Sequence, residues 1–172
     1  MSFPIVEEGK VQIASTRYLA GRGALPYRFS VARGKGINTS EFIAQLSKPF
    51  QSSGFNPQFS SDGADIEALS ETEWWRVECK GTGVGKGPTQ RNNFDRALAS
   101  VVTYFEEPPY PLGTNSESAK LFLGLALPES PDYLRELRRR VRPPLRKCLN
   151  LWVLLYQPST DSVKAISPTE SF

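Results

Sequence analysis

Two acidic residues and a lysine have the side-chain types and the spacing that a catalytic site requires. Glu78 and Lys80 stand two apart in "VECKG", and Asp65 precedes Glu78 by thirteen positions in "ADIEAL". On a β-strand, the side chains of Glu78 and Lys80 point to one face about 7 Å apart, while Cys79 points to the other. A hairpin would bring Asp65 alongside them, with Glu67 on the same face. The sequence therefore predicts a pocket with carboxylates and one ammonium.

Such a pocket suits the hydrolysis of phosphodiesters. Asp65 and Glu78 would bind Mg²⁺, or Mn²⁺ in its place, and a metal-bound water is a better nucleophile than bulk water. Lys80 would orient that water and offset charge on the phosphate. The chain has no histidine and only two cysteines, which excludes Cys/His zinc sites and catalysis by a histidine base. The alternative interpretation is a solvated Glu-Lys pair on an exposed strand.

The glycine-rich stretch after Lys80 does not fit the known phosphate-binding loops. A Walker loop needs a glycine where the chain has Lys80, and a serine or threonine where it has Gly87. The dinucleotide-binding pattern fails because Lys86 takes the place of its third glycine. We expect the stretch to connect a strand to a helix and to keep side chains away from the pocket. Lys86 remains a candidate for contact with a phosphate.

The hydrophobic pattern predicts one α/β domain over residues 1–172, with a mixed central β-sheet flanked by helices. The clearest helical periodicity runs from Phe94 to Phe105, and the apolar run that follows it indicates a strand parallel to the one carrying Glu78. The predicted helices are 5–19, 41–50, 94–105 and 131–142, and the predicted strands are 26–32, 55–61, 64–69, 74–80, 120–127 and 150–157.

In order and spacing, "ADIEAL" and "VECKG" resemble the motif of the PD-(D/E)xK nuclease superfamily, which has the restriction-endonuclease-like fold. Asp65 matches the first acid of the motif, and Glu78 with Lys80 matches its acid-x-Lys. The core order of the family, αβββαβ, matches the elements predicted from about residue 39 to 127, leaving a C-terminal helix and strand. Gln90 matches a glutamine that some branches place on the helix after the third strand.

The chain departs from the family pattern in two places. Ala64 stands where the family has a proline, and the glutamate that some branches carry on the first helix has two candidates, Glu8 and Glu41. The resemblance implies a Mg²⁺-dependent nuclease acting on DNA, with Asp65 and Glu78 as metal ligands, and a homodimer is possible. A catalytically inactive module of the same fold, which binds nucleic acid or another protein, is the alternative.

Basic residues between 135 and 147 predict a surface for a nucleic-acid backbone. Arg138, Arg139 and Arg142 are the candidates there, together with Arg91 and Lys86, and a solvated basic face is an equal alternative. A second basic strip, 17–35, is interleaved with aromatic residues. The net charge of +3 permits a polyanionic partner without demanding one.

No apolar stretch of the sequence is long enough to cross a membrane or to act as a signal peptide, so we expect a cytoplasmic protein without membrane contact. In that reducing setting, Cys79 and Cys148 are expected to be buried apolar side chains rather than a disulfide.

Overall fold

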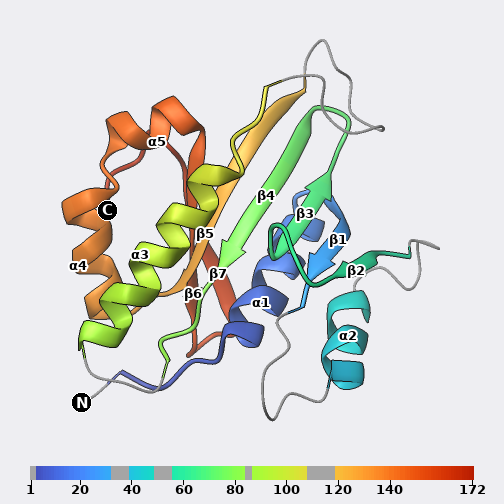
Figure 1. The fold of residues 1–172 in the computed structure, drawn as a ribbon, viewed down its shortest axis with the longest axis horizontal. Helices are drawn as coiled ribbons and strands as arrows, with labels where there is room; N and C mark the ends of the chain where they lie inside the picture. Colours follow the sequence, from blue (N-terminus) through green and yellow to red (C-terminus); the bar gives the residue numbers. More distant parts are fainter. Residues whose placement is uncertain (1–2, 32–38, 49–55, 84–86, 108–118) are drawn as a thin grey trace.

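A seven-stranded mixed sheet crosses the molecule in the order β2-β1-β3-β4-β5-β6-β7, with helices on both faces (Figure 1). The structure is a computed structural model that describes residues 3–31, 39–48, 56–83, 87–107 and 119–172. Its helices are α1 (Glu8–Gly21), α2 (Thr39–Ser47), α3 (Gly87–Thr103), α4 (Pro131–Arg140) and α5 (Pro143–Leu149). Its strands are β1 (Leu25–Ser30), β2 (Gln58–Ser60), β3 (Ile66–Leu69), β4 (Glu73–Cys79), β5 (Lys120–Pro128), β6 (Leu151–Gln157) and β7 (Ser162–Ile166).

The pairing around β4 confirms the predicted hairpin and the predicted parallel crossover. Strands β3 and β4 are antiparallel, with Ile66 opposite Val77. Strands β4, β5 and β6 run parallel, so their carboxyl ends lie at the same end of the sheet. The predicted α/β class with a mixed sheet and flanking helices is therefore confirmed.

The side chains of β4 point alternately to the two faces of the sheet, and each face is covered by one layer of the hydrophobic core. Trp75, Val77 and Cys79 are buried in the apolar layer under α1. Trp74 is buried in the opposite layer, beneath α3 and α4. Because alternate strand residues share a face, Glu78 lies on the α3 side of the sheet.

The helices α3 and α4 form as their sequences predict. Phe94, Ala97 and Val101 recur at helical spacing in α3 and are buried against the sheet. Helix α4 begins with Pro131, a residue tolerated in a first turn, and the side chain of Ser130 accepts a hydrogen bond from the Tyr133 amide.

The helix that covers the hairpin is α1, whereas the order predicted from residue 39 begins with α2, and its first strand, β2, is separated from β3 by β1. Helix α1 packs against β3 and β4, whereas α2 packs on α1. Gly9 allows this contact, because a Cβ there would lie 2.9 Å from the ring of Phe42. The strand beside β3 is β1, and β2 is the edge strand of the sheet, as predicted for 55–61. The three adjacent antiparallel strands are thus formed by β1, β3 and β4.

Two elements near the C-terminus were not predicted. Pro143 and Pro144 end α4, but they also begin α5, because the first turn of a helix needs no donated amide hydrogen bonds. Strand β7 pairs antiparallel with β6 and forms the second edge of the sheet.

Candidate active site

Asp65 and Glu78 lie side by side where β3 begins and β4 ends. Ile66 pairs with Val77, and continuing this register places Asp65 opposite Glu78, a separation of about 5 Å between Cβ atoms. The Cys79 amide donates a hydrogen bond of 2.7 Å to Asp65 Oδ2. Asp65 is 9% exposed and Glu78 is 6% exposed. Two carboxyl groups are therefore held together in a largely buried position.

Lys80 completes the predicted group. Its Nζ lies 3.0 Å from Glu78 Oε1 and 3.2 Å from Glu8 Oε2. The structure thus brings Asp65, Glu78 and Lys80 to one face of the hairpin. It also adds Glu8, one of the two glutamates between which the sequence did not decide.

Gly81 is the reason that Glu8 can approach. A Cβ at Gly81 would lie 2.3 Å from the Val6 carbonyl oxygen and 2.7 Å from the Glu8 amide nitrogen. Thr82 forms two hydrogen bonds to the residues just before α1: its amide donates to Val6 O at 2.9 Å, and its hydroxyl accepts from Val6 N at 2.8 Å. The start of the glycine stretch therefore holds the N-terminus of α1 against the pocket, at positions where the sequence suggested only a connecting loop.

Tyr104 contacts the pocket from the turn that ends α3. Its hydroxyl donates a hydrogen bond of 2.5 Å to Glu78 Oε2. Burial, and then the bond to Glu78, raise the pKa of the Tyr104 phenol, so the group stays protonated and remains a donor. Sequence patterns did not identify this residue; its position at i+10 from Phe94, at the end of a periodic helix, was the only available signal.

The pocket is short of positive charge. Burial raises the pKa of Asp65 to about 8, and repulsion from Glu78 adds to the shift. Burial alone would lower the pKa of Lys80, but the carboxylates of Glu8, Asp65 and Glu78 outweigh it and raise that pKa above its usual value. Three acids thus share one ammonium, and a further cation would relieve the repulsion between them.

The ligand types fit a hard divalent cation. Mg²⁺ prefers carboxylate and water oxygens and is usually held by only one or two carboxylates. Within the described ranges, no three His, Cys, Asp or Glu side chains form a group that could hold a metal ion. A cation bound between Asp65 and Glu78 would therefore keep several ligands from water or substrate.

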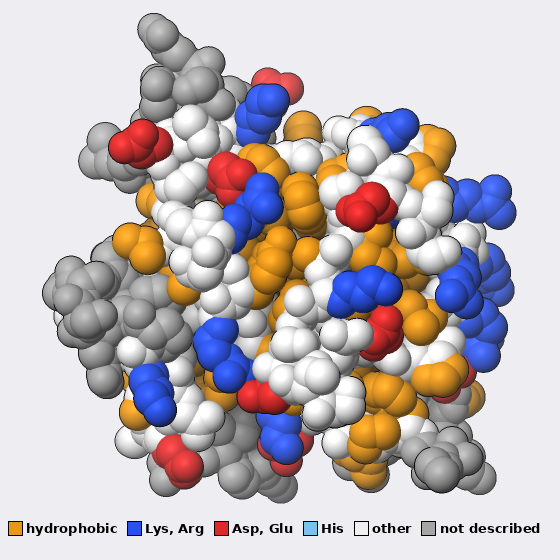
Figure 2. All heavy atoms as spheres, turned by 180° about the vertical axis from the view of Figure 1, so that it is seen from behind, with side chains coloured by type: hydrophobic (Ala, Val, Ile, Leu, Met, Phe, Trp, Pro, Cys, Tyr) orange, Lys and Arg blue, Asp and Glu red, His pale blue; other side chains and the backbone are white. Residues whose placement is uncertain are grey.

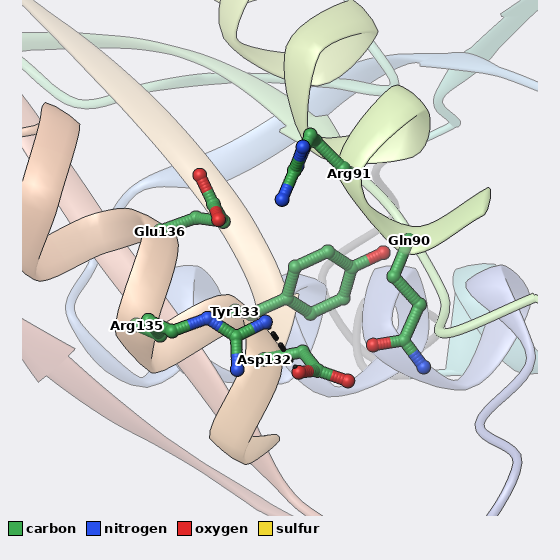
Figure 3. A pocket seen from close by; sticks show the side chains of 6 residues that line it. All are labelled: Gln90, Arg91, Asp132, Tyr133, Arg135 and Glu136. Atoms are coloured by element: carbon green, nitrogen blue, oxygen red, sulfur yellow. Dashed lines mark hydrogen bonds and ion pairs between the residues drawn. The ribbon is translucent and has the colours of Figure 1, made fainter. Parts of the chain in front are cut away.

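Gln90 lies in a different hollow, between the first turns of α3 and α4 (Figure 3). The hollow has room for about one water molecule, with a volume of about 10 Å³, and Gln90 Oε1 is buried without a hydrogen-bond partner. Its lining residues are Gln90, Arg91, Asp132, Tyr133, Arg135 and Glu136. No hydrogen bond joins Gln90 to the carboxyl pair in the described part of the chain. Its supporting role stays a prediction.

The candidate phosphate contacts that the structure describes lie on different helices. Arg138, Arg139 and Arg142 are exposed near the far end of α4. Helix α4 begins three residues after β5 ends, and at a rise of 1.5 Å per residue Arg138 lies roughly 10 Å along the helix from its first residue. Arg91 is exposed in the first turn of α3, the helix that follows β4 in the chain. Lys86 lies outside the described residues.

A denser basic group appears at one edge of the rear view, on the side where α4 and α5 lie in Figure 1 (Figure 2). One member of the predicted basic face does not belong to it. Arg146 is fully buried, and its guanidinium lies over the ring of Phe172 and donates to the carbonyl oxygens of Ser167 and Glu170. It therefore holds the C-terminal segment in place.

The second basic strip, 17–35, is not a free surface where the structure describes it. Arg17 pairs with Asp161 at 2.7 Å, and Arg22 pairs with Glu73 at 2.9 Å. Phe29 is buried in the core. The positions 32–38 lie outside the described residues. In its described part, 17–31, the strip contributes mainly to packing and ion pairs.

The two cysteines differ from each other. Cys79 is buried, as predicted, whereas Cys148 is exposed, and both are free thiols. The prediction of burial is wrong for Cys148 because Cys148 lies on the outer side of the short helix α5, where solvent rather than the sheet is its neighbour.

Comparison with known proteins gave no match: no family model fits the sequence, and no curated protein or solved structure is significantly similar to the chain. Among the described residues, no helix is both long and apolar enough to pass through a bilayer.

Proposed function

We propose that the chain is a Mg²⁺-dependent nuclease of the PD-(D/E)xK type that acts on DNA. One observation carries the proposal: Asp65 and Glu78 meet on the same face of a hairpin, with the Lys80 ammonium 3.0 Å from Glu78. Their order along the strands is the order of the motif that the sequence resembles. The raised pKa of Asp65 supports a cation site, because the carboxyl pair lacks sufficient positive charge.

The order of elements supports the same family. With α2 and β2 taken as an insertion, the chain runs α1, β1, β3, β4, α3, β5, which is a helix, three antiparallel strands, a helix and a strand. In this alignment, α1 is the first helix of the core, so Glu8 rather than Glu41 matches the glutamate present in some branches. Its contact with Lys80 supports that match.

In this proposal, Asp65 and Glu78 hold the metal, and Glu8 helps to orient the lysine. The metal, when bound, would supply a more acidic water and neutralise charge on the phosphate. Because the pKa of Lys80 is raised, the side chain remains an ammonium at neutral pH. It therefore acts as a hydrogen-bond donor and a positive charge beside the phosphate, and cannot serve as a general base.

The substrate would approach along the first turns of α3 and α4. In this proposal, Arg91 would contact a phosphate next to the scissile one, and Arg138, Arg139 and Arg142 would contact phosphates further along the duplex. A homodimer and a cytoplasmic location stay predictions; sedimentation of the purified chain would check the first.

The decisive experiment is cleavage of plasmid and single-stranded DNA with Mg²⁺ or Mn²⁺. Glu78→Ala and Lys80→Ala should each abolish cleavage. Glu71→Ala and Lys120→Ala are matched controls, because both residues are exposed and lie at the end of the sheet away from the pocket. Glu71 lies in the turn before β4, and Lys120 begins the neighbouring strand β5, opposite Glu73. Cleavage that survives both site substitutions would remove the proposed function.

The second candidate is a module that binds nucleic acid without cutting it. The direct ion pair between Lys80 and Glu78 favours it, because that pair already satisfies part of the carboxylate charge. Binding that weakens steeply with salt, with no cleavage under either metal, would support this candidate.

A further inference from the structure

The side chain of Tyr104 contacts both the turn that leads into β3 and the end of β4. Besides its 2.5 Å hydrogen bond to Glu78 Oε2, its hydroxyl lies 3.3 Å from the carbonyl oxygen of Gly63. Gly63 stands two residues before Asp65, in the turn that leads into β3. One hydroxyl thus contacts both the backbone that places Asp65 and the carboxylate of Glu78.

The ring that carries this hydroxyl has little freedom to move. The guanidinium of Arg76 lies over it, 5.1 Å from the ring centroid, and Arg76 Nη1 donates to the Tyr104 carbonyl oxygen at 3.0 Å. Only 9% of Tyr104 is exposed. A donor on a side chain that is itself held by packing and hydrogen bonds can fix the orientation of its partner.

The two oxygens of Glu78 therefore have different environments. Tyr104 holds Oε2, whereas Oε1 faces the Lys80 ammonium at 3.0 Å. Because the tyrosine is neutral, it orients the carboxylate without neutralising its charge. The second oxygen keeps its capacity to bind a cation.

We propose that Tyr104 is a positioning residue, whose hydroxyl fixes the carboxylate of Glu78 relative to Asp65 so that both can present an oxygen to one cation. The cation rests on the proposed function. The orientation of Glu78 does not, and it can be measured in metal-free protein.

The test is Tyr104→Phe, which keeps the ring and its contact with Arg76 and removes only the hydroxyl. Tyr27→Phe is the matched control, because the Tyr27 hydroxyl donates to Glu67, another buried carboxylate on the same face but outside the pocket. In metal-free protein, the carboxyl-carbon NMR signal of Glu78 should move in Tyr104→Phe and stay in Tyr27→Phe. The dissociation constant of Mn²⁺, measured by calorimetry, should rise about 10- to 100-fold in Tyr104→Phe and less than about twofold in the control.

Three outcomes separate this inference from the proposed function. An unchanged Glu78 signal in Tyr104→Phe overturns the inference. A moved signal with unchanged Mn²⁺ affinity also overturns it, because Glu78 would then bind the cation without the hydroxyl. If the native chain binds no Mn²⁺ but the signal moves, the proposed function fails and the positioning of Glu78 stands.

A second variant covers the case in which Tyr104→Phe does not fold. Fluorotyrosine at position 104 has nearly the same shape and a stronger hydroxyl donor. It should move the Glu78 signal in the direction opposite to that expected for the phenylalanine variant, and an unchanged signal would again overturn the inference.

Discussion

Two buried carboxyl clusters lie on the same face of the β3–β4 hairpin, and their charges are balanced differently. Glu67 accepts a hydrogen bond from Tyr27, and its Oε1 lies 3.7 Å from Arg76 and 3.8 Å from Arg28. We call these four residues the Glu67 cluster. The pocket of Asp65, Glu78, Lys80 and Glu8, here the Lys80 pocket, has three acids for one cation. The Glu67 cluster is arranged for stability, and the Lys80 pocket retains an excess of negative charge.

The largest expected difference between the two clusters is in catalysis. Glu78→Gln should lower the DNA cleavage rate by about three orders of magnitude, because it removes a proposed metal ligand. Glu67→Gln makes the same chemical change a short distance along the hairpin and should leave the rate within a few-fold of native for folded protein. Equal losses in the two variants, measured in initial-rate assays with Mg²⁺, would contradict the distinction.

The second expected difference is in stability at neutral pH. Glu67→Gln should lower the free energy of unfolding by about 2 kcal/mol, because it leaves the mostly buried Arg76 without one of its carboxylate partners. Urea unfolding at neutral pH, in the absence of metal, measures the change. A loss below about 0.5 kcal/mol would mean that the arginines do not depend on Glu67.

The Lys80 pocket should respond to pH in the opposite sense to an ordinary ion pair. The pKa of Asp65 is about 8 in the folded protein and 3.8 in a free side chain, so the folded state binds this proton more tightly than the unfolded state does. The contribution to stability is therefore present at low pH and is lost as the pH rises towards 8. At about 1.4 kcal/mol per pKa unit, the loss should be roughly 5 kcal/mol in metal-free protein.

Asp65→Asn isolates this effect from other titrating groups. The amide oxygen can still accept from Cys79, and the group has no charge to ionise. The variant should show a flatter stability profile between pH 5 and 9 by thermal or urea unfolding, and it should be more stable than the native chain at the alkaline end. A profile parallel to that of the native chain would contradict the raised pKa.

The smallest expected effect concerns the exposed arginines Arg138, in the last turn of α4, and Arg142, at the N-cap of α5. Arg138→Gln and Arg142→Gln should each weaken DNA binding about two- to fivefold, and each should reduce the slope of log K against log salt by about one. They should leave the cleavage rate at saturating DNA unchanged. Binding isotherms at several salt concentrations give the affinity and its salt dependence. An unchanged slope would mean that these arginines belong to a solvated face and do not contact DNA.

The hairpin and its pocket were predictable because their signals are local. Alternation in "WWRVECK" assigns Glu78 and Lys80 to one face, and the polar turn before it makes an antiparallel pair with the preceding strand the natural arrangement. Asp65 follows from the same register. The periodicity of α3 likewise depends only on near neighbours in the sequence.

The remaining residues of the pocket depend on contacts between distant parts of the chain. Glu8 reaches Lys80 only because Gly81 lets the N-terminus of α1 approach, and no local pattern relates positions so far apart. The pattern of α1 is also blurred, because its buried face includes the polar residues Gln12, Ser15 and Thr16. For these reasons, the sequence could not select α1 over α2 as the core helix, nor Glu8 over Glu41.

Because one cysteine is buried beside the site and the other is exposed, their reactivity towards thiol reagents can report whether the end of β4 is folded. Burial raises the pKa of the Cys79 thiol, and the Cys79 amide is bonded to Asp65, whereas Cys148 is exposed. A thiol reagent should therefore modify one group per molecule rapidly and the second only when the end of β4 opens. Counting slow-reacting thiols in each variant would show whether a lost activity reflects altered chemistry or a disordered strand.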